Sequence, residues 1–228
     1  MTLSAHALVT DLPRHPEVRI YDLCGTGLDL LWELHKDTNR FQSLFEAPVV
    51  ALDTETTGLD PLNDDLVLIT LAIPGYAYLF RPCHMPLLRP IFARPGTTFL
   101  IQHAPFDLGF IYAKFGINIP ASRVYDTRLA ERQYLDRTNQ KGSASLSAQI
   151  RHYFGMPLDK TPQLSFKVDQ PLTKAQIEYA AQDALDLFPL AMQHLITHRT
   201  LQPDNIMDLV HMYDYIDAKG TKSLPGRK

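Results

Sequence analysis

Residues 49–58 read VVALDTETTG, and the assignment of the fold starts from this stretch. An apolar run ends in two acidic residues, Asp53 and Glu55, which stand two positions apart. Side chains at positions i and i+2 of a β-strand point to the same face, so these carboxylates converge on one point. Two carboxylates held together repel each other unless a proton or a cation lies between them. The stretch therefore predicts a buried strand that ends at a divalent-cation site, an arrangement typical of phosphate chemistry.

Two more apolar segments, 66–73 and 76–80, follow this strand after short connections. The first connection contains DPLND at residues 60–64, and the second is Pro74-Gly75, both of which favour turns. Connections this short predict an antiparallel meander of three strands.

The next part of the chain alternates strands with helices. Strands are predicted at 97–101 and 124–125, and helices at 105–115, which Gly116 ends, and from 126 to about 135. This alternation predicts parallel pairing of the later strands. The remaining predicted elements are a strand at 18–23, helices at 28–45, 85–93, 145–154 and 174–198, and loops at 136–143 and 157–171. The 174–198 helix is expected to begin with Thr173 and Gln176 as a capping box and to kink at Pro189.

The length of 228 residues and the ordinary composition predict one catalytic domain, at residues 46–200. Residues 1–45 are expected to form an entry element packed on this domain, and residues 201–228 a helical segment with a basic flexible tail. The net charge of −3 at pH 7 excludes the strong, sequence-blind attraction of a very basic protein for nucleic acid. Any contact with nucleic acid must therefore be local.

The chain has two cysteines, Cys24 and Cys83, which are too few for a disulfide framework and fit a reducing compartment. No segment has the ~18 uninterrupted apolar residues of a membrane span, and residues 1–13 lack the pattern of a signal peptide. These observations predict a cytoplasmic protein without a membrane partner.

Two further acidic residues stand out once the elements are placed. Asp107 lies at the start of the helix that follows the 97–101 strand, and Asp183 lies on the last long helix. Tyr179 precedes Asp183 by four residues, and positions i and i+4 share one face of a helix. A hydroxyl and a carboxylate are thus presented together.

On these residues the chain resembles the DEDD exonucleases, in their tyrosine-bearing branch. The three motifs are Asp-x-Glu at 53–55, a Phe-Asp step within HAPFD at 103–107, and Tyr-x-x-x-Asp at 179–183. The resemblance runs from about residue 49 to 195 and implies a ribonuclease H-like α/β fold, a mixed sheet with an antiparallel meander, then parallel strands, and helices on both faces. The sequence looks closest to the proofreading domain of bacterial DNA polymerase I, and ribonuclease D is a more distant relative.

The resemblance implies a metal-dependent 3′-5′ exonuclease that uses two divalent cations, Mg²⁺ or Mn²⁺, and releases nucleoside 5′-monophosphates. Asp53 would bridge both ions, Glu55 and Asp183 would complete the site that activates water, and Asp107 would hold the second ion. Two metals about 4 Å apart can stabilise the attacking and the leaving oxygen together. Tyr179 would orient the attacking water by a hydrogen bond.

The same resemblance predicts contacts with the substrate. Leu59 matches a position where the family places an apolar wedge between the last two bases, which favours action at a chain end, and ordinary packing within the turn is the alternative. Thr56 and Thr57 could offer backbone N–H groups or hydroxyls to the 3′ end. His103 stands where polymerase-type sequences carry Asn, and Phe106 belongs to the same motif.

Because the likeness to a proofreading domain is closest, single-stranded or frayed 3′ ends of DNA are favoured over RNA. The enzyme is expected to stand alone in proofreading or repair, or to act beside a polymerase in trans. The first alternative is a ribonuclease D-like 3′-5′ exoribonuclease, which would use the same ligands. The second is a catalytically silent nucleic-acid-binding module.

Other polar residues have simpler interpretations. Asp60, Asp64 and Asp65 are predicted turn formers, and Asp126 is a predicted helix N-cap. Asp186 could replace Asp183 as a ligand, but the Tyr-x-x-x-Asp spacing favours Asp183.

Two histidines and several basic residues complete the candidates. His194 and His198, four apart on a helix, could bind zinc, but no further Cys or His lies at a suitable spacing, so they are predicted to be surface residues near a helix C-terminus. Basic side chains between the second and third motifs are either solvated charges or contacts for a passing single strand. These are Lys141, Arg151, Lys160 and Lys167.

Overall fold

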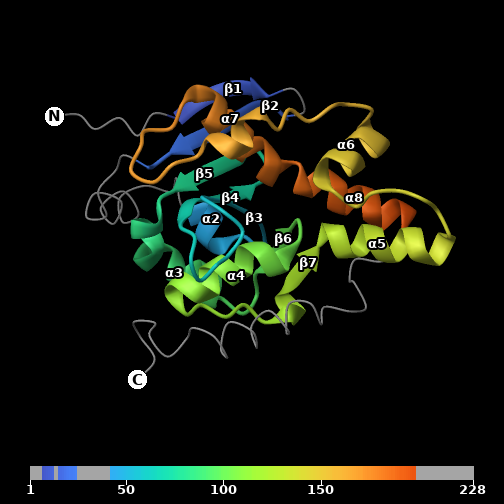
Figure 1. The fold of residues 1–228 in the computed structure, drawn as a ribbon, viewed down its shortest axis with the longest axis horizontal. Coiled ribbons are helices and arrows are strands. Elements are labelled where there is room, and N and C mark those ends of the chain that lie inside the picture. Colours follow the sequence, from blue (N-terminus) through green and yellow to red (C-terminus); the bar gives the residue numbers. More distant parts are fainter. Residues whose placement is uncertain (1–6, 13–14, 25–41, 199–228) are drawn as a thin grey trace.

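The computed structural model describes residues 7–12, 15–24 and 42–198 (Figure 1). The strands are β1 (Ala7–Leu12), β2 (His15–Asp22), β3 (Val49–Thr56), β4 (Leu66–Ile73), β5 (Tyr76–Phe80), β6 (Thr98–Ile101) and β7 (Val124–Asp126). The α-helices are α2 (Gln42–Glu46), α3 (Met85–Ala93), α4 (Ala104–Phe115), α5 (Thr127–Thr138), α6 (Leu146–Phe154), α7 (Lys174–Leu185) and α8 (Leu187–Thr197). Three short 3₁₀ helices lie at Pro82–His84, Ala121–Arg123 and Thr161–Ser165.

All seven strands form one mixed sheet in the order β1-β2-β5-β4-β3-β6-β7. The β3-β4-β5 segment is an antiparallel meander, and β6 and β7 add to β3 as parallel strands. The predicted α/β fold, with a meander followed by parallel strands, is confirmed. Strand β3, which carries the two acids, lies between β4 and β6, so neighbouring strands protect both of its edges.

The N-terminal part of the chain extends this sheet. Strand β2 covers residues 18–22 of the strand predicted at 18–23 and pairs parallel to β5. Strand β1, which was not predicted, pairs antiparallel to β2. Of the helix predicted at 28–45, the described residues include only α2 at its C-terminal end, and residues 25–41 lie outside the described part of the chain. The predicted segment 201–228 also lies outside it.

Helices cover both faces of the sheet, as predicted. Alternate side chains of β3 enter two different hydrophobic cores, with Val50 and Leu52 on the side of α3 and α4 and Ala51 on the side of α7. Figure 1 shows α3 and α4 in the lower part of the view, and α5, α6 and α8 together at the right. Strand β4 is buried along its whole length, as expected for a strand covered on both faces.

The long helix predicted at 174–198 is two helices in the structure. Helix α7 ends at Leu185 and α8 begins at Leu187. Pro189 has no N–H to donate to the carbonyl of Leu185, four residues earlier, so the α-helical hydrogen bonds are interrupted at this point. Helix α5 is longer than predicted and continues to Thr138, where Asn139 ends it in the left-handed conformation.

The prediction that His194 and His198 are surface residues is wrong, because both side chains are buried. The face of α8 that carries them packs against α5 and α6 rather than facing solvent. In the part of the chain that the structure describes, no helix is both long enough and apolar enough to cross a membrane.

Candidate active site

Strand β3 presents Asp53 and Glu55 on the face of the sheet that α7 covers. Ala51 belongs to the core on that side, and residues 51, 53 and 55 share a face because side chains alternate along a strand. Glu55 is buried and Asp53 is half-buried. The two carboxylates therefore sit side by side beneath a helix.

Helix α7 supplies the tyrosine and the third carboxylate. The predicted capping box is present, since Thr173 accepts from the backbone N–H of Gln176 and the Gln176 side chain accepts from the N–H of Thr173. It fixes where the helix starts, and α7 then packs across β3, β4 and β5. Tyr179 and Asp183 are both buried, and they lie close enough for the Asp183 carboxylate to raise the pKa of the tyrosine hydroxyl.

Asp107 reaches the same site from the opposite face of the sheet. It lies in the first turn of α4, and its Oδ1 accepts a hydrogen bond of 2.7 Å from the Thr54 hydroxyl. Thr54 is the residue between Asp53 and Glu55, so its side chain points to the other face of β3. Strand β3 therefore carries the carboxylates of Asp53 and Glu55 on one face, and through Thr54 it binds the carboxylate of Asp107 on the other.

Asp126 fixes the start of the helix that carries Asp107. The side chain caps α5 as predicted, with Oδ1 accepting from the N–H groups of Arg128 and Leu129 at 2.9 and 3.1 Å. It also accepts from the N–H groups of His103 at 3.0 Å and Ala104 at 2.8 Å, at the N-terminus of α4. One buried carboxylate therefore satisfies the starts of two helices.

The charges of Asp107 and Asp183 act on both carboxylates of β3. Burial raises the pKa of Asp53 well above its usual range, and the charges of Glu55, Asp107 and Asp183 raise it further. Burial, with the charges of Asp183 and Asp107, raises the pKa of Glu55 in the same way. Burial raises the pKa of Asp107 to about 7, against the lowering effect of the Thr54 hydrogen bond. Such a cluster is stable in its charged form only with cations among the oxygens.

The four predicted substrate contacts have different local roles. Leu59 is 82% exposed on the loop after β3, so the alternative of packing within the turn is not supported. The Thr56 hydroxyl donates to the Gly58 carbonyl at 2.6 Å and is therefore engaged in the turn. His103 has a left-handed backbone with φ of 70°, and Phe106 packs against Phe110 with ring centroids 5.2 Å apart.

The other aspartates near the site are held by local structure. Asp60 accepts from the N–H of Leu62 and the side chain of Asn63, and Asp64 accepts from the N–H of Asp60. These contacts match the predicted role of both residues as turn formers. Asp186 is hydrogen-bonded to His15 of β2 at 2.8 Å, so it is held by a strand away from β3.

Two residues that support the candidate site, Thr54 and Asp126, were not predicted from the sequence to do so. The effect of a third, Lys160, was underestimated. Thr54 is the unspecified position of the Asp-x-Glu motif, and the second role of Asp126 depends on a contact between two helix starts. Lys160 was one of four basic candidates, but its charge lowers the pKa of both Asp53 and Glu55 and so acts on the site itself. Its segment is held to α7 by the Gln176 side chain, which donates to the Ser165 carbonyl at 3.0 Å.

Comparison with known proteins assigns this arrangement to a family. The family model described as 3′-5′ exonuclease matches residues 35–195. Ribonuclease D of Escherichia coli (strain K12) is 28% identical over 152 residues, which are 65% of this chain and 39% of that protein. The catalytic core of RRP6 from Trypanosoma brucei shares the fold with a TM-score of 0.62 at 18% identity, covering 95% of this chain and 54% of that one. The structure of Brucella melitensis NrnC with bound Mg²⁺ has a TM-score of 0.58 at 22% identity, and the match covers 79% of this chain and 87% of that one.

The fold and the site thus define an α/β nuclease of the DEDD class. The chain belongs to the 3′-5′ exonuclease family, and it carries a tyrosine in the third motif. It spans 39% of the length of the ribonuclease D that it matches.

Proposed function

We propose that this chain removes nucleotides from the 3′ ends of single-stranded nucleic acid in a metal-dependent reaction that releases nucleoside 5′-monophosphates. The observation that carries this proposal is the convergence of Asp53, Glu55, Asp107 and Asp183: the charges of the other three act on Asp53, and those of Asp107 and Asp183 act on Glu55. They come from β3 and from helices on both faces of the sheet. Membership of the 3′-5′ exonuclease family supports the direction of degradation.

The donor set fits Mg²⁺ or Mn²⁺. All four ligands are carboxylates, and hard divalent cations prefer oxygen ligands. Asp53, Glu55 and Asp183 would hold one ion, and Asp53 with Asp107 would hold the other. When bound, two such ions supply Lewis-acid stabilisation of the attacking and leaving oxygens. That the related NrnC was solved with bound Mg²⁺ supports this choice of metal.

Tyr179 would act as a hydrogen-bond donor. Burial, together with the charges of Asp183, Glu55 and Asp53, raises the pKa of its hydroxyl above the usual value near 10. The hydroxyl therefore keeps its proton at neutral pH and cannot accept another from water. It can hold a water or a phosphate oxygen in position, which is the role proposed for it.

Action at a chain end is supported by Leu59. An apolar side chain that is 82% exposed beside a carboxylate cluster has no packing role in the described structure. Inserted between the last two bases, it would bury apolar surface only where a strand ends and the terminal base can unstack. Lys160, whose charge reaches Asp53 and Glu55, would attract the phosphate of that nucleotide.

Two sugars are candidates, and each has its own support. The likeness of residues 53–60 and 173–185 to a polymerase proofreading domain favours DNA. The 28% identity to ribonuclease D favours RNA, and it covers 65% of this chain. A polymerase acting in trans is a partner for the DNA candidate alone.

Matched DNA and RNA oligonucleotides, labelled at the 5′ end and incubated with Mg²⁺ or Mn²⁺, test the proposal. We expect a ladder of products shortened from the 3′ end, together with free mononucleotides, and the faster of the two substrates identifies the sugar. Asp53→Ala and Asp183→Ala should abolish the ladder, and Tyr179→Phe should slow it about 100-fold. Asp136→Asn, an exposed change on α5, is the control. Unchanged degradation by Asp53→Ala, or internal cleavage by the wild type, would overturn the proposal.

A further inference from the structure

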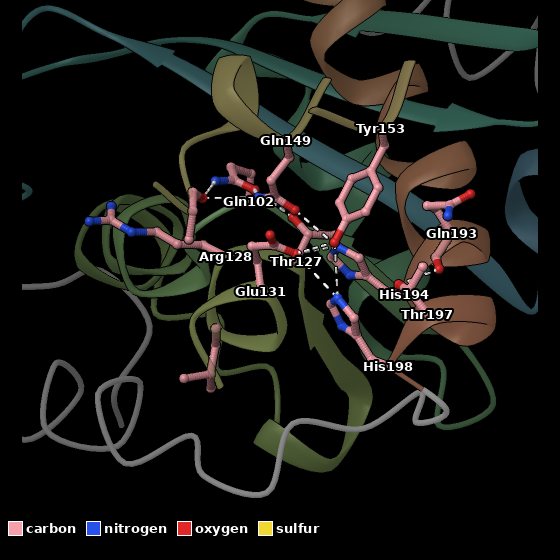
Figure 2. Close-up of polar contacts among 12 residues, drawn as sticks. Gln102, Thr127, Arg128, Glu131, Gln149, Tyr153, Gln193, His194, Thr197 and His198 are labelled. Atoms are coloured by element: carbon pink, nitrogen blue, oxygen red, sulfur yellow. Dashed lines mark hydrogen bonds and ion pairs between the residues drawn. The ribbon is translucent and has the colours of Figure 1, made fainter. Parts of the chain in front are cut away.

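A second group of metal-ligating side chains lies between α5 and α8. Glu131 of α5 meets His194 and His198 of α8, and all three side chains are buried (Figure 2). The Glu131 Oε2 atom is 3.5 Å from His194 Nε2 and 3.2 Å from His198 Nε2. This Glu131–His194–His198 cluster shares no residue with the four-carboxylate site. Sequence spacing alone provided no third ligand for the histidine pair, and the fold provides Glu131.

The cluster brings one carboxyl and two imidazoles together in a buried place, and no lysine or arginine is ion-paired with Glu131 among the described residues. The Glu131 carboxyl instead contacts the Tyr153 hydroxyl and the Nε2 atoms of both histidines. One carboxylate and two imidazoles are a typical donor set for a divalent transition metal.

The two distances from Glu131 are compatible with tetrahedral coordination. Ligand atoms at the usual metal–nitrogen and metal–oxygen distances of about 2.0 to 2.2 Å lie about 3.3 to 3.5 Å from each other. The two distances from Glu131 Oε2 fall close to this range. The Tyr153 hydroxyl lies 2.8 Å from Glu131 Oε2 and 3.2 Å from His198 Nε2, so a further oxygen is present beside the three ligands.

The surroundings of His194 allow its Nε2 to become a ligand. Without a metal, Gln149 Oε1 accepts from His194 Nε2 at 2.9 Å, because the Gln149 amide nitrogen donates to Ala144 and Gln102. His194 Nδ1 lies 3.1 Å from the Tyr125 hydroxyl. Moving the imidazole proton to Nδ1 makes Tyr125 its acceptor and leaves the Nε2 lone pair for a metal. Such a hydrogen bond on the second nitrogen is usual for metal-bound histidine.

Aromatic stacking restrains the two imidazoles of the cluster. The His194 and His198 rings are stacked, with centroids 4.3 Å apart, and Tyr134 stacks on His198 at 4.2 Å. The Nε2 atoms of both restrained rings lie within 3.5 Å of Glu131 Oε2.

We propose that Glu131, His194 and His198 bind one divalent transition-metal ion of the Zn²⁺ class. Two imidazoles and one carboxylate favour Zn²⁺ over Mg²⁺, which prefers an all-oxygen set. The ion joins α5, which begins at Asp126, to α8, which follows the helix that carries Tyr179 and Asp183. It is therefore a structural ion, separate from the catalytic ones.

Metal content and Co²⁺ spectroscopy test the site without any use of activity. The full chain is stripped with a chelator, dialysed, and loaded with Zn²⁺ or Co²⁺ alone. To remove the carboxylate site, the experiment uses the Asp53→Asn/Asp183→Asn background. We expect one tightly bound Zn²⁺ per chain, a visible absorption band of tetrahedral Co²⁺, and a higher melting temperature with Zn²⁺.

Variants of the cluster then assign the ligands. Glu131→Gln and His198→Gln should remove both the bound Zn²⁺ and the Co²⁺ band, while circular dichroism reports that the fold is kept. Tyr125→Phe, which removes the acceptor for His194 Nδ1, should weaken Zn²⁺ binding by roughly 10-fold to 100-fold. Because the Co²⁺ spectrum is also taken on the intact cluster, failure of a variant to fold does not decide the outcome. No stoichiometric Zn²⁺ in the background protein, an octahedral Co²⁺ spectrum, or equal binding by Glu131→Gln would overturn the proposal.

Discussion

Thr54 and Thr70 are both buried threonines of the central strands, yet their hydroxyls have different environments. Thr54 donates to Asp107 at 2.7 Å, whereas the Thr70 hydroxyl has no hydrogen-bond partner in the described structure. Thr54→Val should lower the free energy of unfolding by about 1 to 2 kcal/mol, because a buried carboxylate loses a donor. It should also raise the Mg²⁺ concentration needed for half-maximal activity.

Thr70→Val is the matched change on the neighbouring strand. It removes a buried hydroxyl that makes no hydrogen bond, so we expect a neutral or stabilising effect. Urea unfolding and Mg²⁺ titration of activity compare the two variants. Equal costs and equal Mg²⁺ requirements would show that Thr54 does not position Asp107.

Leu59 and Leu62 offer a similar contrast within one loop. Leu59 is 82% exposed, whereas Leu62 packs against the core on the side of α3 and α4. Leu59→Ala should leave the free energy of unfolding within about 0.5 kcal/mol of wild type and raise the KM for an oligonucleotide roughly 10-fold. Leu62→Ala should have the opposite pattern, with lower stability and an unchanged KM. Steady-state kinetics and urea unfolding measure both, and an unaltered KM for Leu59→Ala would rule out the wedge.

At the scale of elements, the starts of α4 and α5 depend on one side chain. Asp126 accepts four backbone N–H groups, two from each helix. In Asp126→Asn an amide NH₂ group replaces one oxygen and faces a donor. If Oδ1 still accepts from His103, Arg128 and Leu129, the N–H of Ala104 at the start of α4 loses its acceptor. We expect a cost of about 1 to 2 kcal/mol in the free energy of unfolding. Because Asp107 lies in the first turn of α4, the Mg²⁺ requirement should rise as well.

Asp136→Asn is the control for this prediction, since Asp136 is exposed near the other end of α5. It should change neither stability nor the Mg²⁺ requirement. If Asp126→Asn loses stability but keeps the wild-type Mg²⁺ titration, Asp126 caps the helices without positioning Asp107.

Much of the element order could be predicted from local sequence. Strands β3, β4 and β5 and helix α3 have the predicted bounds to within one residue, because apolar runs and turn residues mark them directly. The separation of α7 from α8 depends on the missing N–H donor of Pro189. The proline predicts that the helix is interrupted, but the residue at which the break falls is harder to predict. Strand β1 was missed because its partner β2 provides its hydrogen bonds, and pairing is not a local property.

The limits of prediction at the sites have the same physical cause. Asp53, Glu55, Asp107, Tyr179 and Asp183 were chosen by motif spacing, and the structure brings them together. Thr54 acts through a hydrogen bond to a residue 53 positions away in the chain, and Asp126 acts through hydrogen bonds to residues 22 and 23 positions away. No local sequence pattern encodes these contacts. Likewise, Glu131 joins His194 and His198 only because α5 packs against α8.

Considered as a whole, the molecule places the acids of the candidate site where they oppose folding. The pKa values of Asp53, Glu55 and Asp107 are raised first by burial, and those of Asp53 and Glu55 also by charges of the same sign. Residues arranged for function at the expense of stability can often be replaced with a gain in stability. The surrounding sheet, covered on both faces, must offset this cost.

The double variant Asp53→Asn/Asp183→Asn tests this balance. In the presence of EDTA it should melt a few degrees above wild type, because neutral amides replace carboxylates that repel each other, and 1 kcal/mol corresponds to about 2 to 4 °C in a chain of this size. Adding Mg²⁺ should raise the melting temperature of wild type but not of the double variant. Asp65→Asn/Asp136→Asn changes the net charge by the same amount at exposed positions and should have neither effect. If this control stabilises the protein equally, the gain comes from overall charge and not from the site.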